Sequence, residues 1–332
     1  MKHTTIALFV PHKGCPHQCS FCNQKSISGE SRSITAADVE AAVETAKQNP
    51  YLKNAEIAFF GGSFTAIDRG YMLSLLEAAQ KYIDSVKICG IRISTRPDAV
   101  DDEICGILKS HGVTAVELGA QSMSDKVLMM NKRGHTAADV ESAIDLLKKY
   151  GFETGLQMMT GLYGSDKNES IVTASKIIDL KPDTVRIYPT VVMENTELAD
   201  LYYKGIYRPQ TVDEAAEICA ELILMFESAG IRIIRVGLHS GGGVEQGRIA
   251  GAFHPAFKEI CESKIYLKET ESQLAAKGEY TVYVPKGALS QAIGQKKSNL
   301  IYLAGKGYSC RFKESDSLVK YQVLVKEMKY DT

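Results

Sequence analysis

The sequence predicts an α/β fold, in which a partial (β/α)6 barrel of the TIM type precedes a small α+β domain. Three observations lead to this fold class. Short apolar runs alternate with amphipathic helical patterns along residues 6–188, these runs end in polar or glycine-rich residues, and the pattern changes near residue 255. Alternating strands and helices are typical of a parallel sheet, whose functional side chains gather at the carboxyl ends of its strands.

The apolar runs are short enough for buried strands, and helical spacing of apolar residues fills most of the intervals. The six expected strands cover residues 6–10, 55–60, 88–94, 113–118, 153–159 and 184–188. The expected crossover helices cover residues 35–48, with Thr35 as N-cap, and 101–111, 124–130, 136–150 and 169–180. Helices at 194–204 and 212–229 and a further strand at 231–236 follow the sixth strand.

We expect two domains, a barrel over residues 1–250 and a small α+β domain over residues 251–332. The second domain is expected to contain a helix at 255–277, a strand at 280–284 and two helical stretches within 287–303. Two strands, at 309–312 and 319–325, complete it. Its length lies within the usual range for a minor domain.

Composition indicates an ordinary globular protein. Of 332 residues, 45% are hydrophobic and 24% are charged, and the formal net charge of -1 gives no global basic field that would demand a nucleic acid. We therefore predict no DNA partner. The N-terminus lacks the apolar segment of a signal peptide, and no apolar run reaches the length of a membrane span, so we expect a cytoplasmic protein without membrane association.

Three cysteines lie within eight residues: Cys15, Cys19 and Cys22, spaced C-x3-C-x2-C. Three soft ligands on one short loop suit iron or zinc. A cube of four irons needs four ligands, so three thiolates leave one iron open to a cofactor or substrate. A structural zinc site, with His12 or His17 as fourth ligand, is the alternative. The other five cysteines are isolated and are expected to be small buried hydrophobic residues.

Polar residues and glycines follow successive expected strands, which predicts that they line one pocket at the mouth of the barrel. A tight turn or a surface ion pair is the alternative for each of them taken singly. The set comprises Gly61, Gly62 and Ser63 after the second strand, Ser94 and Arg96 at the third, Glu117 and Gln121 at the fourth, Gln157 at the fifth, and Arg186 and Tyr188 at the sixth.

These motifs together resemble the radical S-adenosylmethionine (SAM) superfamily over roughly residues 5–240. The resemblance rests on the cysteine loop after the first strand, the glycine pair after the second and the string ELGAQS at 117–122. Within the superfamily the sequence is most similar to the Elp3-like group, and also to oxygen-independent coproporphyrinogen III oxidase. The strings STRPD at 94–98, LGAQS at 118–122 and RIYPT at 186–190 carry this finer resemblance.

The resemblance implies a role for each matching position. Cys15, Cys19 and Cys22 would hold a 4Fe-4S cluster, whose fourth iron would chelate SAM. Phe21 would lie by the adenine, Gly61 and Gly62 would meet the SAM amino group, Gln121 would bond the ribose and Arg133 would bond the carboxylate. The expected cofactor-binding residues also include Ser63, Ser94, Arg96 and Glu117, of which the last two are candidates for the substrate side as well. The cluster would cleave SAM reductively to a 5′-deoxyadenosyl radical.

The sequence also departs from these relatives. Elp3 has a wider spacing between its first two cysteines and carries an acetyltransferase domain, for which we see no counterpart, so acetyl-CoA chemistry is not expected. Asn23 stands where coproporphyrinogen oxidase has a further cysteine, which argues against a second SAM and against the porphyrin reaction. The absence of another cysteine cluster argues against an auxiliary iron–sulfur cluster.

The string IGQKKSNL at 293–300 is similar to the clamp loop of KH modules, in which a GxxG turn cradles a nucleic-acid backbone. Lys297 replaces the second glycine. Lys286, Lys296, Lys297 and Lys306 make this region locally basic. The small domain is therefore expected to be KH-like and to bind tRNA, with a solvated loop on a stabilising domain as the alternative.

Two classes of function follow. The first is a radical SAM enzyme that acts on a tRNA base or on a nucleobase-like small molecule of the queuine or porphyrin kind, with a flavodoxin or ferredoxin as electron donor. The second is a non-catalytic RNA-binding or redox-sensing iron–sulfur protein. The expected substrate-side residues are Gln157, Arg186, Tyr188, Arg235 and His239.

Overall fold

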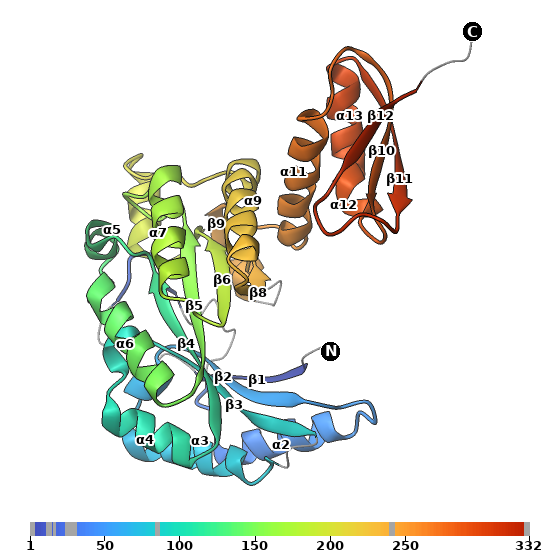
Figure 1. The fold of residues 1–332 in the computed structure, drawn as a ribbon. Coiled ribbons are helices and arrows are strands. Elements are labelled where there is room, and N and C mark those ends of the chain that lie inside the picture. Colours follow the sequence, from blue (N-terminus) through green and yellow to red (C-terminus); the bar gives the residue numbers. More distant parts are fainter. Residues whose placement is uncertain are drawn as a thin grey trace.

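The computed structural model describes residues 4–10, 15, 18–23, 32–83, 87–238 and 243–328. Its main element is a curled parallel sheet of seven strands in the order β1-β2-β3-β4-β5-β6-β8, which forms a half-barrel (Figure 1). The predicted α/β half-barrel is confirmed. The sheet has one strand more than the six-strand barrel predicted, because the segment near residue 231 pairs with β6 and extends the sheet.

The strands agree with the sequence expectations to within a few residues. They are β1 (Thr4–Val10), β2 (Ala55–Gly61), β3 (Ile88–Thr95), β4 (Val113–Gln121), β5 (Glu153–Thr160), β6 (Thr184–Pro189) and β8 (Arg232–Val236). The crossover helices are α2 (Ala36–Lys47), α3 (Arg69–Gln80), α4 (Asp102–Ser110), α5 (Asp125–Met130), α6 (Ala137–Lys149), α7 (Lys167–Asp179) and α9 (Val212–Ser228).

Helix α3 was not expected, although its pattern is present in the sequence. Met72, Leu75, Leu76 and Ala79 are buried and follow the i, i+3, i+4, i+7 spacing of an amphipathic helix. Asp68 caps the helix, because its side chain accepts a hydrogen bond from the Tyr71 backbone N–H. The helix completes the strand–helix alternation between β2 and β3.

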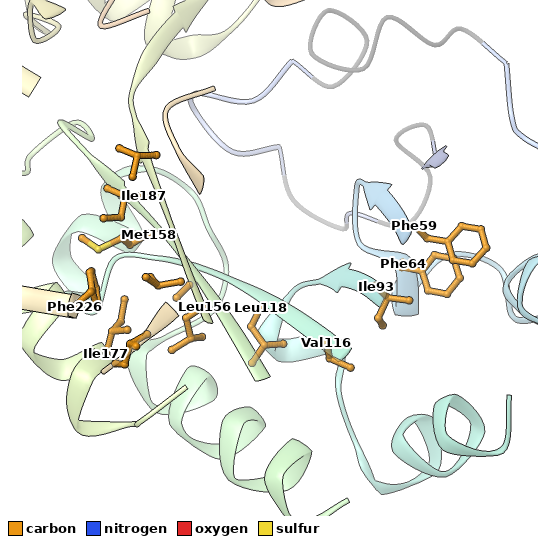
Figure 2. Packing of buried hydrophobic residues seen from close by; sticks show 14 of the residues in the cluster. Phe59, Phe64, Ile93, Val116, Leu118, Leu156, Met158, Ile177, Ile187 and Phe226 are labelled. Atoms are coloured by element: carbon orange, nitrogen blue, oxygen red, sulfur yellow. The ribbon is translucent and has the colours of Figure 1, made fainter. Parts of the chain in front are cut away.

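The two faces of the sheet differ in character. On the outer face, side chains of successive strands, among them Ile93, Leu118, Leu156 and Ile187, pack in the hydrophobic core (Figure 2). The ring of Phe59 stacks on that of Phe64, with centroids 4.8 Å apart. Since side chains alternate along a strand, the remaining positions point to the inner face, where several are charged. The outer face therefore holds the helices, and the inner face is left for polar interactions.

A smaller substructure follows β6. It consists of the antiparallel strands β7 (Val191–Met193) and β9 (Arg248–Gly251) and the short helices α8 (Glu197–Tyr203) and α10 (Gly243–Gly247). Val192 and Leu198 form the centre of a separate hydrophobic cluster here. Because β7 continues directly from β6, this cluster lies at the carboxyl end of the sheet.

The small C-terminal domain contains a second, three-stranded sheet in the order β11-β10-β12. Its elements are α11 (Phe257–Glu271), β10 (Gly278–Pro285), α12 (Leu289–Ile293), α13 (Ser298–Gly305), β11 (Tyr308–Ser315) and β12 (Leu324–Glu327). Strand β12 begins five residues later than the predicted strand at 319–325. Helix α11 packs against α9 of the half-barrel and against α12 (Figure 1). The domain boundary at residues 250 and 251 stays a prediction.

Within the described part of the chain, no helix combines the length and the apolar character needed to cross a bilayer.

Candidate functional site

Gly61 lies where the first two strands end and the cysteine loop begins. It pairs with Val10, its φ is +108°, and a Cβ placed on it would lie 2.2 Å from the Val10 carbonyl oxygen. A side chain at this position would collide with the backbone of β1. The close approach of β1 therefore explains why position 61 is glycine. The expected contact with a SAM amino group stays a prediction for Gly61 and for Gly62.

The cysteine loop is anchored from two sides. The Ser20 hydroxyl donates to the Asn131 side-chain oxygen at 2.8 Å, and the Ser20 N–H donates to the Asn131 carbonyl at 3.1 Å. The Ser20 carbonyl in turn accepts from the Leu198 N–H of α8 at 2.8 Å. Both Ser20 and Asn131 are buried. The segment after α5 and the start of α8 thus fix the position of the loop.

The three cysteines lie in different environments. Cys19 is buried, and its carbonyl accepts from the Cys22 N–H at 3.1 Å, whereas Cys15 and Cys22 are half-buried. Burial, with the neighbouring Cys19, raises the pKa of the Cys15 thiol. No three His, Cys, Asp or Glu side chains of the described residues stand in an arrangement that could hold a metal. The assignment of the three thiols as iron ligands therefore stays a prediction.

One guanidinium group contacts Cys19, and a second is bonded to the backbone of the first. Arg133 donates from Nη1 to the Cys19 Sγ at 3.2 Å and from Nη2 to the Gly119 carbonyl at 2.7 Å. Arg96 holds the Asp98 carboxylate with two hydrogen bonds of 2.9 and 2.8 Å, and it donates to the Arg133 carbonyl at 2.6 Å. Both arginines are buried. The loop of thiols therefore faces a fixed positive charge.

Buried polar atoms without a partner gather around this pair of arginines. Among the described residues, six buried side-chain nitrogen or oxygen atoms lack a hydrogen-bond partner, and four of them are Arg96 Nη1, Gln121 Oε1, Arg133 Nε and His135 Nδ1. Leaving such an atom unsatisfied costs about 1–3 kcal/mol, so a concentration of them indicates a site for a polar ligand. Guanidinium donors with an amide oxygen suit a ligand that carries a carboxylate and hydroxyl groups, as SAM does.

The backbone of β4 positions the side chains that carry these unsatisfied atoms. Gln121 has a φ of +65°, and the pairing of β4 with β5 shifts register between Leu118 and Gln121. A Cβ at Gly119 would lie 2.8 Å from Gln121 Nε2 and 3.3 Å from Arg133 Nη2. The irregular strand end turns the Gln121 side chain toward Arg133, and the glycine leaves room for both side chains.

Sequence reasoning missed His135, which is 4% exposed. Its Nε2 lies 3.3 Å from the Ala120 carbonyl, and burial, with Arg133 and Arg96, lowers the pKa of the imidazole to about 4. His135 and Cys19 both line a cavity of about 1100 Å³. The run NKRGH at 131–135 is the sequence feature that could have pointed to His135. Three of its residues, Asn131, Arg133 and His135, contribute to the site.

Ser63 and Ser94 have protein partners. The Ser63 hydroxyl lies 2.8 Å from that of Thr95 and accepts from the Arg96 N–H at 3.2 Å. The Ser94 hydroxyl accepts from Gln157 Nε2 at 3.3 Å. The first contact joins the ends of the neighbouring strands β2 and β3, and the second reaches from β3 across β4 to β5. In this structure both serines therefore position the strand ends around the site.

Glu117 is enclosed by cations on the inner face of the sheet. Its carboxylate is 1% exposed, and it accepts from Arg186 Nε and Nη2, the latter at 2.8 Å, and from Gln157 Nε2 at 3.1 Å. Arg92 lies 3.4 Å from Glu117 and also binds the carboxylates of Glu56 and Glu153. Glu117 therefore belongs to an ion-pair network that ties β2 through β6 together.

The expected substrate-side residues of the described chain lie near one another. Arg186 pairs across the strands with Gln157 and with Arg235, and its guanidinium lies over the Phe60 ring, 5.2 Å from the centroid. Arg186 Nη1 lies 3.5 Å from the Tyr188 hydroxyl, whose pKa is raised by burial. His239 lies outside the described residues.

Phe21 belongs to the cysteine loop, between Cys19 and Cys22. It is half-buried and packs against the hydrophobic cluster of Val192, Leu198, Ala199 and Tyr207 beyond β6. This contact helps to hold the loop in place, and the expected contact with adenine stays a prediction.

Comparison with known families assigns most of the chain. Residues 9–176 match the family described as the Radical SAM superfamily, and residues 182–267 match the Radical_SAM C-terminal domain. The first match contains the cysteine loop, the glycine pair and the arginines described above. It ends within α7, whereas β6, β8 and α9 fall in the second match.

Curated relatives give a narrower grouping. The tRNA uridine(34) acetyltransferase of Methanocaldococcus jannaschii is 30% identical over 254 residues, which cover 64% of this chain and 47% of that protein. Human Elongator complex protein 3 is 28% identical over 161 residues, which cover 47% of this chain and 29% of that protein. The chain spans about half the length of the tRNA uridine(34) acetyltransferases it matches.

Solved structures agree on the fold. The archaeal Methanocaldococcus infernus Elp3 with an N-terminal deletion superposes with a TM-score of 0.65 at 23% identity, covering 83% of this chain and 66% of that chain. Streptococcus suis SuiB gives a TM-score of 0.52 at 14% identity, covering 71% of this chain and 50% of that chain.

Proposed function

Because this chain belongs to the radical SAM superfamily, we propose that it is an enzyme that cleaves S-adenosylmethionine reductively at a 4Fe-4S cluster and modifies a tRNA base or a nucleobase-like substrate. The observation that carries the proposal is the group of unsatisfied polar atoms on Arg96, Gln121, Arg133 and His135 next to Cys19. These atoms lie at the carboxyl ends of the strands, where barrel enzymes place their chemistry.

In this proposal Cys15, Cys19 and Cys22 hold three irons, and Arg133 and Gln121 bind polar groups of SAM. A bound cluster would supply one electron to SAM, whose carbon–sulfur bond would break to give methionine and a 5′-deoxyadenosyl radical. The residues of the chain position the cofactors and supply positive charge beside them. Arg133 contacts the Cys19 sulfur and would compensate negative charge on it once iron is bound, and Arg96 fixes the backbone of Arg133 through its 2.6 Å hydrogen bond.

The inner-face residues support the assignment of the substrate side. Gln157 of β5, Arg186 and Tyr188 of β6 and Arg235 of β8 lie on neighbouring strands, and the ion pair with Glu117 holds Arg186 in place. A raised pKa keeps the Tyr188 hydroxyl protonated at neutral pH, so it is able to donate a hydrogen bond to a base edge. We assign these four residues to substrate binding.

Two kinds of support favour tRNA as the substrate. A relative 30% identical to this chain is named for its action on a tRNA uridine, and the C-terminal domain has an excess of basic residues. We further propose that this domain contacts the tRNA, that a flavodoxin or ferredoxin donates the electron, and that the enzyme works in the cytoplasm. A reducing compartment suits both reduced cysteines and an oxygen-sensitive cluster.

Anaerobic reconstitution tests the proposal. Protein loaded with iron and sulfide should produce 5′-deoxyadenosine from SAM when dithionite is added, as measured by mass spectrometry. The variant Cys19→Ala should lose this activity, whereas Cys89→Ala, a matched change at an exposed cysteine of β3, should keep it. A protein that binds iron but produces no 5′-deoxyadenosine would instead be the redox-sensing protein considered above, and the enzyme assignment would be wrong.

The substrate class needs a second measurement. Total tRNA treated with the reconstituted enzyme should show one modified nucleoside that is absent when SAM is omitted. Loss of this product in Arg235→Ala, with 5′-deoxyadenosine formation retained, would support the substrate-side assignment. An unchanged nucleoside profile, together with turnover of a free nucleobase, would favour the small-molecule alternative.

A further inference from the structure

The C-terminal domain has the opposite charge balance to the rest of the molecule. Residues 278–328 contain eight lysines and arginines and four acidic residues, although the whole chain has a net charge of -1. The remainder is therefore acidic overall. A local basic excess on an otherwise acidic protein is the electrostatic signature of a surface for a polyanion.

The order of elements in this domain is that of a nucleic-acid-binding module. Strand β10 leads into α12, a four-residue loop, α13 and β11, and β11 lies parallel to β10 in the sheet. Two helices joined by a short loop between two strands form the part of KH domains that holds the backbone of four nucleotides. The loop here consists of Gly294, Gln295, Lys296 and Lys297.

Contacts with α11 and α12 hold the loop 294–297 in place. A Cβ on Gly294 would lie 2.4 Å from the Ser298 hydroxyl and 2.9 Å from that of Ser263 on α11, so only glycine fits. Asn299 is 4% exposed and donates from Nδ2 to the carbonyls of Ser263 and Ala292, at 3.0 and 2.9 Å. These contacts fix the loop to both α11 and α12.

The two lysines of the loop are presented to solvent in an unusual conformation. Lys296 and Lys297 have φ values of +52° and +63°, and both are exposed. Left-handed backbone is unfavourable for residues with a side chain. Lys286 and Lys306 pair with Asp316 and Glu271, whereas Lys296 and Lys297 have no acidic partner within the described part of the chain. The loop therefore offers two unneutralised charges at a fixed position.

Helix α13, which follows the loop, carries large exposed side chains. Ile301 is 67% exposed and Tyr302 is 42% exposed, and Lys306 lies over the Tyr302 ring at 4.4 Å. Single-stranded nucleic acids are bound by the combination of cations for phosphates and aromatic or apolar side chains for bases. Ile301 and Tyr302 lie one turn beyond the lysine loop, so α13 supplies both kinds of contact.

We propose that the loop 294–297 and the exposed side of α13 form a binding surface for single-stranded RNA. Lys296 and Lys297 contact phosphates, and Ile301 and Tyr302 contact bases. The inference rests on the proposed function in one respect, since it identifies where the enzyme would hold a tRNA substrate outside its active site.

The open face of the three-stranded sheet is the competing surface. Thr281 lies between Arg311 and Lys326 in the register of the sheet, and Tyr283 lies beside Lys313. Lys326 covers the Tyr283 ring at 5.6 Å, and Glu279 lies on the same face. Since Lys306 also covers the Tyr302 ring of α13, the two surfaces differ mainly in charge. Glu279 brings negative charge to the sheet face, whereas the loop lysines have no acidic partner among the described residues, so the sheet face serves as a matched control.

Fluorescence anisotropy of the full chain with a labelled single-stranded RNA of about 12 nucleotides tests the surface, because such sites span about 4–16 nucleotides. The double variant Lys296→Glu/Lys297→Glu should raise Kd at least about tenfold. It should also reduce the slope of log K against log salt by about 1.4, which corresponds to two lost phosphate contacts. The control Lys313→Glu/Lys326→Glu, with the same change in charge, should raise Kd less than about threefold.

Two further variants separate shape from charge. Lys297→Gly removes one charge but suits the left-handed backbone, so Tm should not fall and the affinity should decrease only a few-fold. Ile301→Ser should weaken binding without changing the salt slope. Absence of RNA binding by the unmodified chain, or an equal loss in the sheet-face control, would overturn the proposal.

The same variants distinguish this inference from the proposed function. Lys296→Glu/Lys297→Glu should form 5′-deoxyadenosine from SAM at the unmodified rate when no RNA is present. If the unmodified chain binds RNA through the loop but forms no 5′-deoxyadenosine, the RNA surface stands and the enzymatic assignment falls. If it forms 5′-deoxyadenosine but shows no loop-dependent RNA binding, the enzymatic assignment stands and the RNA surface falls.

Discussion

Individual residues at the carboxyl end of the sheet carry constraints that their type alone does not reveal. Gly61 has to be glycine because its α-carbon faces the Val10 carbonyl, at the point where β1 leads into the cysteine loop. His135 is uncharged because it is buried beside two guanidinium groups. Neither constraint follows from the local sequence, since both arise from segments that are distant along the chain.

We predict that Gly61→Ala lowers the free energy of unfolding by more than about 3 kcal/mol, through the clash with Val10 and the positive φ. Urea unfolding followed by circular dichroism measures the change. Gly106→Ala is the matched control: Gly106 lies within α4 with open space around it, so alanine should raise the stability by about 0.5–1 kcal/mol. Equal effects of the two variants would contradict the close approach of β1.

His135 makes the stability of the apoprotein depend on pH. The pKa of its imidazole is about 4 in the fold, below the ordinary value of about 6.5, so the unfolded chain binds a proton more readily. The folded state should therefore lose up to about 3 kcal/mol of stability as the pH falls from about 6.5 to 4. The variant His135→Gln should remove this part of the pH dependence. Parallel stability curves for both proteins between these pH values would refute the assignment.

At the scale of the elements, the five strands β2 to β6 are joined on their inner face by ion pairs. Glu117 on β4 binds Arg186 on β6, and Arg92 on β3 links Glu56 on β2 to Glu153 on β5. A buried ion pair contributes little net stability, but removal of one partner leaves an uncompensated charge. The network therefore fixes the relative positions of the strand ends that carry the site.

Glu117→Gln should lower the free energy of unfolding by about 3–5 kcal/mol, because Arg186 loses its carboxylate partner inside the sheet. The comparison variant is Glu103→Gln, which breaks an exposed ion pair with Arg69 and should cost less than about 1 kcal/mol. Thermal or urea unfolding distinguishes the two. A cost below about 1 kcal/mol for both variants would show that the inner-face network is solvated.

At the scale of the whole molecule, α11 joins the half-barrel and the C-terminal domain into one hydrophobic core. Cys261 and Ile265 of α11 belong to the same cluster as Cys219 of α9 and Val282 of β10. Phe257, at the start of α11, packs against Gly237 at the end of β8, where a Cβ on the glycine would lie 2.9 Å from the Phe257 Cβ. We expect the two parts to unfold together.

Phe257→Ala should therefore lower stability by about 3–5 kcal/mol and reduce hydrogen-exchange protection in α9 and in β10 together. Phe312→Ala, a half-buried change within β11, should reduce protection mainly in the C-terminal sheet. Mass spectrometry of exchanged peptides measures both variants. Loss of protection in α9 alone after Phe257→Ala would mean that the domains unfold independently.

The repeating pattern of the chain was enough to predict most of the fold. Short apolar runs predicted the strands and amphipathic intervals predicted the helices, because a strand buried on both faces is apolar throughout and a helix on the surface buries only one side. The seventh strand, which follows a helical segment, was expected as a strand but not counted in the barrel. Helix α3 has the same kind of local signal, since Met72, Leu75, Leu76 and Ala79 follow the helical period.

The sequence by itself determined which residue types are available to the site, because the cysteines, the glycines and the arginines, and their places after successive strands, can be read along the chain. Only the tertiary structure decided how these side chains are used. It showed that Glu117 is bound by Arg186, that Ser63 holds β3, that Asn131 anchors the cysteine loop and that His135 joins Arg133 beside Cys19. The physical reason is that hydrogen bonds and burial depend on which distant strands meet, whereas apolar periodicity is a local property.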